Sequence, residues 1–99
     1  GEALLILAKL EPQRAEEYLK EVISLGLPQL QSRAVINLAY LYLQRGEKEK
    51  AKRLLDKYAD RVTDVDKLVD LYIRLGEFKK LYYLLQELIA VDNSYTKVA

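Results

Sequence analysis

The chain of 99 residues contains no cysteine and no histidine, and these absences remove several kinds of chemistry. Without cysteine there is no disulfide, no thiolate nucleophile and no cysteine-bound zinc. Without histidine the chain lacks the commonest metal ligand and general base. Asp66 and Asp70 form one carboxylate pair at helical spacing, but no base, thiol or glycine-rich anion loop accompanies them. We therefore expect no enzymatic activity, no metal and no cofactor.

An excess of one charge is also missing. Lysine and arginine number 16 against 15 aspartate and glutamate, which gives a net charge of +1. A balanced chain has no global field that attracts nucleic acid or anionic lipid, so we expect neither as a partner, although an RNA-binding helical repeat is the nearest different class.

Long apolar runs and a secretory leader pattern are absent as well. A helix that crosses a bilayer needs about 20 apolar residues. The pattern predicts a soluble protein without membrane insertion and favours the cytoplasm, but it does not identify the compartment. The length suits a single domain over residues 1–99. Because the chain enters at once on an apolar run after Gly1, we expect a fragment of a longer protein.

The few prolines and glycines mark the ends of predicted helices. Pro12 ends a helix over 2–10 and begins one over 13–25, Gly26 and Pro28 separate that helix from one over 29–45, and Gly46 and Gly76 close the third and fifth helices. The cluster Thr63, Asp64 and Asp66 is an N-cap signal for the fifth helix. A sixth helix over 77–91 is predicted to stop at Asp92, Asn93 and Ser94, with a seventh opening over 95–99.

The stretch 33–61 contains two predicted helices whose distributions of apolar residues differ. The helix before Gly46 is apolar around most of its circumference, so it must be covered on more than one side. The helix after Gly46 carries one apolar stripe opposite a charged face, so it touches protein on one side only. The stripes expected in the core are Ala15, Tyr18, Leu19, Val22 and Ile23; Val35, Leu38, Ala39 and Tyr42; Ala51, Leu54, Leu55 and Tyr58; Val65, Leu68, Val69 and Tyr72; and Phe78, Leu81, Leu84, Leu85 and Leu88.

The second, fourth and sixth helices repeat one apolar spacing three times. It starts at Ala15, Ala51 and Leu81, so the successive periods are 36 and 30 residues. A helical hairpin repeated every ~34 residues is typical of a solenoid. We predict an all-α, right-handed solenoid of six helices in about three antiparallel hairpins, over 2–26, 28–61 and 63–92. The alternative is a compact three-hairpin bundle without an extended groove.

These residues resemble the tetratricopeptide repeat family. The matching positions are Leu38, Ala39, Tyr42, Gly46, Ala51 and Leu55 in the central unit and Leu68, Tyr72, Gly76 and Leu85 in the third. Val35 and Val65 stand where the family often has tryptophan, and no proline closes a unit. The resemblance implies a non-catalytic module that binds a protein or peptide in a concave groove lined by the first helix of each hairpin.

Carried onto this sequence, the groove positions of the family are Arg33, Ile36, Asn37, Tyr40, Leu43, Gln44, Asp66, Asp70, Ile73 and Arg74. The stripe of Ile36, Tyr40 and Leu43 fits a binding surface; the alternative is ordinary core, covered by the C-terminal segment. Asp66 and Asp70 fit a ligand with some positive charge, although they could be a solvated face.

A second hypothesis is self-association through terminal helices. The apolar run over 3–10 has no preceding hairpin to cover it, and an open solenoid end needs a polar cap. We therefore predict a homodimer, or exchange of terminal helices, as the alternative to groove binding.

Overall fold

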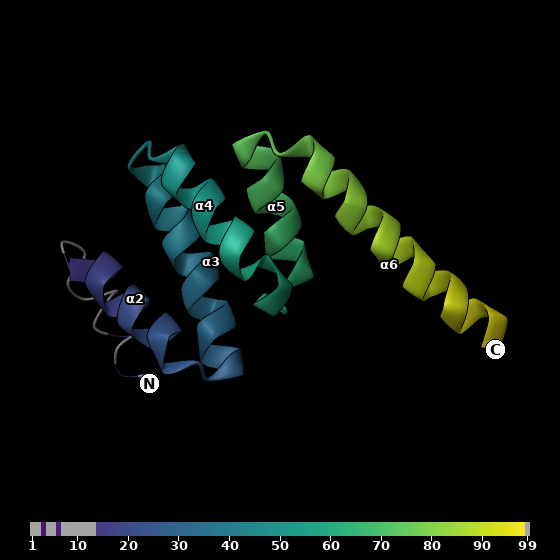
Figure 1. Cartoon of the computed structure of the whole chain (residues 1–99), viewed down its shortest axis with the longest axis horizontal. Helices are drawn as coiled ribbons and strands as arrows, with labels where there is room; N and C mark the ends of the chain where they lie inside the picture. Colours follow the sequence, from purple (N-terminus) through teal and green to yellow (C-terminus); the bar gives the residue numbers. More distant parts are fainter. Residues whose placement is uncertain (1–2, 4–5, 7–13, 99) are drawn as a thin grey trace.

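The computed structural model describes residues 3, 6 and 14–98, with side chains described as far as Ala90. The described residues form helices and turns and contain no strand, which confirms the all-α class. The helices, labelled as in Figure 1, are α2 Ala15–Leu25, α3 Pro28–Gln44, α4 Lys48–Tyr58, the short 3₁₀ helix η2 Ala59–Arg61, α5 Val65–Leu75 and α6 Phe78–Val98. The predicted helix over 2–10 and Pro12 lie outside the described residues, apart from Ala3 and Ile6.

The predicted helix ends are confirmed where glycine or proline marks them. Gly26 and Gly76 cap α2 and α5 in the left-handed conformation, each with φ of 71°, and Gly46 follows α3 with φ of 74°. Pro28 is the first residue of α3. Asp64 caps α5, because its side chain accepts a hydrogen bond from the Lys67 backbone N–H at 3.3 Å.

Helix α3 is the centre of the packed core. It packs against α2 and α4 and also contacts α5 (Figure 1). Its buried residues are Gln31, Ser32, Ala34, Val35, Ile36, Leu38, Ala39 and Tyr42. The prediction that this helix is covered on more than one side is therefore confirmed.

Helices α2 and α4 bury one face each, as their single apolar stripes predict. The buried residues are Ala15, Leu19, Val22 and Ile23 in α2 and Ala51 and Leu55 in α4. Tyr18, Leu54 and Tyr58 pack against this core while remaining partly exposed. In α5 the core residues are Leu68, Leu71, Tyr72 and Leu75.

Two buried polar side chains of α3 join it to neighbouring segments. The Gln31 amide donates to the Ile23 carbonyl at 3.0 Å, and this oxygen near the end of α2 also accepts the Gly26 N–H at 3.2 Å. The Ser32 hydroxyl accepts from the Thr63 backbone N–H at 2.9 Å, and the two hydroxyl oxygens lie 3.2 Å apart. The turn that leads into α5 is therefore held to the first part of α3 by hydrogen bonds as well as by packing.

The prediction that the sixth helix stops at Asp92–Ser94 is wrong. Helix α6 continues without a break to Val98, so the residues expected to open a seventh helix belong to α6 instead. Aspartate, asparagine and serine cost less than about 1 kcal/mol each inside a helix, and neither glycine nor proline follows them to force an end. Figure 1 shows that α6 runs away from the other helices towards the C-terminus.

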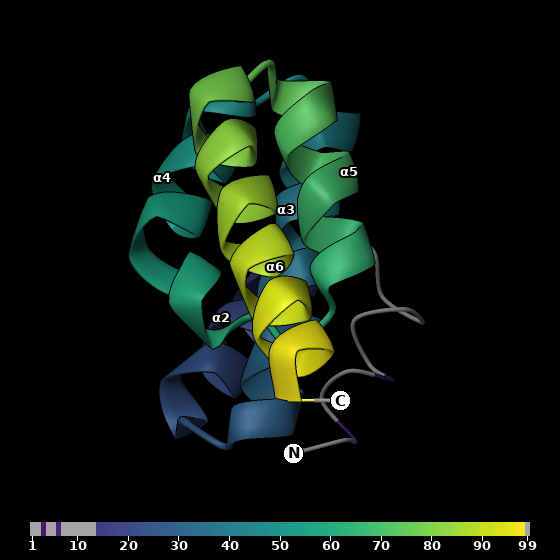
Figure 2. The same cartoon turned by 90° about the vertical axis from the view of Figure 1, so that its right-hand side faces the viewer.

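The core stripe predicted for the sixth helix is also partly wrong. Phe78 and Leu85 are exposed, and Leu81, Leu84 and Leu88 are only half-buried. The reason is that α6 packs mainly against α5, whereas α4 packs against α3 and also contacts α5. Figure 2, which looks towards α6, shows this helix on the outside of the molecule in front of α4 and α5. The resulting shape is elongated, with extents of 48 × 27 × 19 Å.

Candidate interaction surfaces

Three of the predicted groove residues come together between α3 and α5. The Tyr40 hydroxyl donates to Asp70 Oδ2 at 2.6 Å, and Arg74 Nε donates to the same oxygen at 2.7 Å. The Arg74 guanidinium also lies 6.0 Å from the centre of the Tyr40 ring, within cation–π range. Three side chains that the family resemblance assigned to one groove thus contact one another in the structure.

These contacts change the ionisation of the three side chains. Burial, together with the hydrogen bond to Asp70, raises the pKa of Tyr40 to about 12. The hydrogen bonds from Tyr40 and Arg74 lower the pKa of Asp70, and Asp70 raises the pKa of Arg74. Asp70 is thus ionised and already paired with Arg74. Of the two aspartates Asp66 and Asp70, Asp66 is the more exposed.

The remaining groove residues do not form one continuous apolar surface. Ile36 is only 3% exposed and belongs to the core, because α2, α4 and α5 together cover α3. A partner cannot reach Ile36 in this structure, so the prediction that Ile36 lines a binding groove is wrong. Asn37 and Leu43 are half-buried, and Arg33, Gln44, Asp66, Ile73 and Arg74 are exposed.

A larger apolar surface lies on α6. Phe78, Tyr82, Leu85 and Ile89 are spaced by four, three and four residues, which places them on one side of a helix. Their exposed fractions are 64%, 59%, 43% and 57% respectively. We call these four residues the α6 stripe. Leu81 and Leu84, on the adjacent side of the helix, pack against the core.

The exposure of the α6 stripe contrasts with the corresponding position of α4. Leu85 lies 30 residues after Leu55, as Gly76 lies 30 residues after Gly46. Leu55 is 1% exposed, because α4 has neighbours in α3 and in the α5 segment. Helix α6 packs against its own hairpin partner α5, but within the part of the chain that the structure describes no further helix lies beside it as α5 lies beside α4. The same position in the hairpin is therefore core in α4 and surface in α6.

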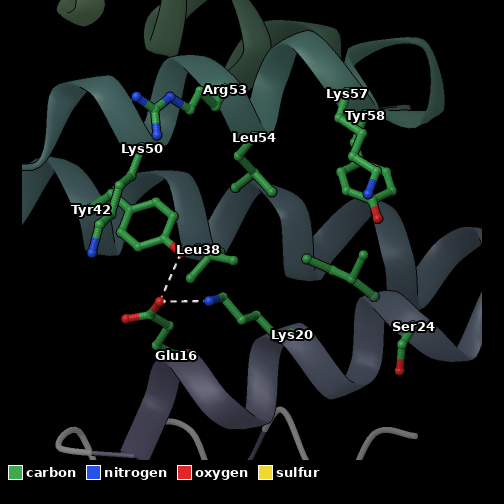
Figure 3. Close-up of a pocket in the computed structure, with 11 residues that line it drawn as sticks. Glu16, Lys20, Ser24, Leu38, Tyr42, Lys50, Arg53, Leu54, Lys57 and Tyr58 are labelled. Carbon is green, nitrogen blue, oxygen red and sulfur yellow. Dashed lines mark hydrogen bonds and ion pairs between the residues drawn. The ribbon is translucent and has the colours of Figure 1, made fainter.

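An open pocket of about 470 Å³ lies between α2 and α4, above α3 (Figure 3). Its apolar side chains are Ile23, Leu38, Leu54, Tyr42 and Tyr58, and its cations are Lys20, Lys50, Arg53 and Lys57; Glu16 and Ser24 complete the lining. We call it the α2–α4 pocket. It opens on a different side of α3 from Tyr40, since Leu38 and Tyr42 point into it (Figure 3).

Glu16 is the single carboxylate in the α2–α4 pocket and has three partners. It accepts hydrogen bonds from the Tyr42 hydroxyl at 2.9 Å and from Arg45 Nη1 at 3.1 Å, and its ion pair with Lys20 Nζ measures 2.9 Å. The bond from Lys20 is the main reason that the pKa of Glu16 is lowered, and the Tyr42 hydroxyl adds to the effect. The negative charge of Glu16 is therefore balanced by Lys20 and Arg45.

Sequence reasoning missed the α2–α4 pocket and the α6 stripe for different reasons. Arg53 and Lys57 were interpreted as part of the charged face of the helix after Gly46, and nothing in their spacing indicates that α2 lies opposite them. A signal for the α6 stripe did exist, because the four-three-four spacing is visible in the sequence. It was hidden by the assumption that Phe78 and Leu85 repeat the buried positions of α4.

Comparisons with protein-family models, with curated proteins and with solved structures find no match for this chain. Among the described residues no group of three or more acidic side chains could hold a metal ion. None of the helices described here is long and apolar enough to cross a membrane. The geometry of the surfaces is thus the main guide to function.

Proposed function

We propose that this chain is a non-catalytic protein-interaction domain whose α6 stripe binds an apolar helix of another polypeptide. The observation that supports this is the exposure of four large apolar side chains in one row on α6. A contiguous apolar surface of this kind is uncommon on a monomeric protein unless something binds to it. Aromatic side chains such as Phe78 and Tyr82 are also the type enriched where proteins bind one another.

We further propose that the helices form a solenoid like that of tetratricopeptide repeats. The turns after α3 and α5 support this, because they contain the same hydrogen bond 30 residues apart. The Glu47 N–H donates to the Tyr42 carbonyl at 2.8 Å, and the Glu77 N–H donates to the Tyr72 carbonyl at 2.9 Å. Together with Gly46 and Gly76, they give the two hairpins the same turn.

The repeat suggests what kind of segment binds the α6 stripe. Helix α4, in which Leu55 is 1% exposed, contacts its hairpin partner α3 and also α5, the first helix of the following hairpin. By the 30-residue offset, a helix in the corresponding place would cover Leu85 and its neighbours. The proposed partner is therefore a helix with an apolar face, packed beside α6 as α5 is packed beside α4.

A second copy of the chain is the second candidate for this partner, which would make the domain a self-associating subunit. The spacing of the α6 stripe is the same in both directions along the helix. Two antiparallel copies of α6 would therefore place Phe78 opposite Ile89 and Tyr82 opposite Leu85, as a twofold interface requires. The predicted uncovered run over 3–10 lies mostly outside the described residues and adds no support.

Site-specific photo-crosslinking tests both forms of this proposal. A benzophenone amino acid in place of Tyr82 should form crosslinks in the purified chain or in an extract of the source cells, because the side chain lies on the proposed contact. The same group in place of Lys67, an exposed residue of α5, is the control and should form far fewer. A product of twice the chain mass would identify a second copy, and a product of another mass would identify a different protein. Equal crosslinking from both positions, or none from position 82, would contradict the proposal.

A further inference from the structure

We infer that the α2–α4 pocket is a second binding site, which takes a segment of a partner protein that presents carboxylates beside a large apolar side chain. This site lies on α2, α3 and α4 and does not include the α6 stripe. The inference therefore does not depend on the function proposed for α6.

The charge of the pocket is the first argument for an anionic occupant. Four cations line it against one carboxylate, Glu16. Glu16 is already bonded to Tyr42, Lys20 and Arg45 and also interacts electrostatically with Lys50, so the excess of positive charge lies mainly with Arg53 and Lys57. The local excess of positive charge is notable because the whole chain carries only +1.

The cations contributed by α4 are largely without a carboxylate partner. Lys50 has one ion pair, with Glu47 at 3.4 Å. Among the described residues Arg53 has no carboxylate within 4.0 Å, and Lys57 lies over the Tyr58 ring at 5.3 Å without a carboxylate of its own. The carboxylate Asp56 on the same helix is paired with Lys80 of α6 instead. Arg53 and Lys57 are therefore free to pair with carboxylates of a partner.

The apolar side of the pocket is the second argument. Leu38 and Ile23 are almost completely buried at its base, and Leu54 and Tyr58 are half-buried beside them. Figure 3 shows the apolar side chains of α3 and α4 between the charged groups. A volume of about 470 Å³ is in the range of ligand pockets and can receive a leucine or phenylalanine side chain. An inorganic anion alone would leave this apolar surface uncovered.

The shape of the pocket favours a peptide segment. The lining runs from Glu16 to Ser24 on α2 and from Lys50 to Tyr58 on α4. Eight residues of helix span about 12 Å, at 1.5 Å per residue. An extended chain covers this length with about four residues. The pocket is thus long enough for one apolar side chain with a carboxylate on each side.

Fluorescence anisotropy with two synthetic peptides tests this inference. One labelled peptide has the sequence Glu-Glu-Leu-Phe-Glu-Glu, and the other has glutamine in place of every glutamate. We expect the acidic peptide to bind at least about tenfold more tightly, and its affinity to fall as salt is added, because salt screens exposed ion pairs. The double variant Arg53→Gln/Lys57→Gln should weaken binding of the acidic peptide by about tenfold or more.

The matched control is the double variant Lys67→Gln/Lys79→Gln. It removes the same total charge from exposed positions of α5 and α6, away from the pocket. It should change the affinity by less than about twofold, since only long-range screened charge is lost. Circular dichroism should show the same helix content in both variants, because all four side chains are at least partly exposed and outside the core.

Three results would overturn the inference. Equal binding of the two peptides would show that carboxylates are not selected. Equal loss in the two double variants would show an effect of net charge without a pocket. Binding of sodium dodecanoate together with failure of both peptides would assign the pocket to small amphipathic anions. Retention of peptide binding by a Tyr82→Glu variant would confirm that this site and the α6 stripe act separately.

Discussion

Two tyrosines on α3 join this helix to neighbours on opposite sides. Tyr40 donates to Asp70 of α5, and Tyr42 donates to Glu16 of α2. The two residues are only two positions apart, which turns their side chains to nearly opposite faces of the helix. Each hydroxyl meets a carboxylate that also binds a basic side chain, Arg74 in the first case and Lys20 in the second. The family resemblance placed Tyr40 and Asp70 in the same groove without predicting that they pair, and the sequence gives no sign of the contact between Tyr42 and Glu16.

Glu16 should make the stability of the domain depend on pH. Its pKa is lower in the folded chain than in the unfolded one, so its contribution is present above the unfolded pKa of about 4.3 and is lost as the pH falls through the folded value. We expect Glu16→Gln to lower the free energy of unfolding by about 1 kcal/mol at pH 7 and by much less at pH 2.5. Urea unfolding at the two pH values measures this difference.

The neighbouring residue Glu17 provides the control. Glu17 lies in the same first turn of α2, but it is exposed and has only a long contact with Arg14 at 3.7 Å. Glu17→Gln should therefore change stability by less than about 0.5 kcal/mol at either pH. A loss for Glu16→Gln that is the same at pH 7 and pH 2.5 would mean that ionisation of Glu16 does not contribute.

At the level of the elements, the hairpins repeat in their turns but not in their burial. Gly46 and Gly76 have nearly the same φ, and each is followed by the same backbone hydrogen bond. Helix α4 nevertheless buries Leu55, whereas α6 leaves Leu85 at the surface. A repeat in sequence therefore identifies the positions of the hairpin, while the neighbours of each helix decide which of these positions is core.

A pair of equivalent substitutions should show this difference in stability. Leu55→Ala is expected to lower the free energy of unfolding by about 2–5 kcal/mol, because it leaves a cavity at a fully buried site. Leu85→Ala should cost less than about 1 kcal/mol in the monomer, because much of the side chain is already in water. Thermal or urea unfolding of both variants measures the two losses. Similar losses would mean that Leu85 is buried in solution.

The success of the helix prediction depended on residues that end helices by backbone geometry. Gly26, Gly46 and Gly76 adopt φ values that other residues avoid, and Pro28 cannot continue a preceding helix, so their positions were predictable. Asp92, Asn93 and Ser94 end helices only through hydrogen bonds to the backbone, and the same residues are tolerated within a helix. This is why the end of α6 was predicted seven residues too early, at 91 instead of 98.

At the level of the whole molecule, burial decreases towards the C-terminal end. Helix α3 has eight buried residues and neighbours on several sides. In α6 no side chain that the structure describes is fully buried. Both candidate surfaces result from how the helices pack: α6 packs mainly against α5, which leaves the α6 stripe exposed, and α2 and α4 lie on either side of the α2–α4 pocket. The arrangement involves contacts between distant residues, which a local sequence pattern does not specify.

Native-state hydrogen exchange should reveal the same gradient. Amides in the middle of α3, near Leu38, should exchange only through global unfolding, because their surroundings are the most buried of the core. Amides of α6 after Leu85 should exchange much faster at concentrations where the chain is monomeric, because this part of the helix can open without exposing the core. Equal protection of the two helices under dilute conditions would contradict the expectation. Protection of α6 that increases with concentration would instead report self-association.

The hydroxyl group of Ser32 helps to set how α5 is placed relative to the helices before it. It accepts the Thr63 N–H at the junction where the chain leaves the first hairpins and enters α5. This bond acts together with the packing of α5 on α3 and α4 to fix the direction in which α5 leaves the first helices. Because α6 packs mainly against α5, the same junction also bears on the direction in which the exposed side of α6 faces.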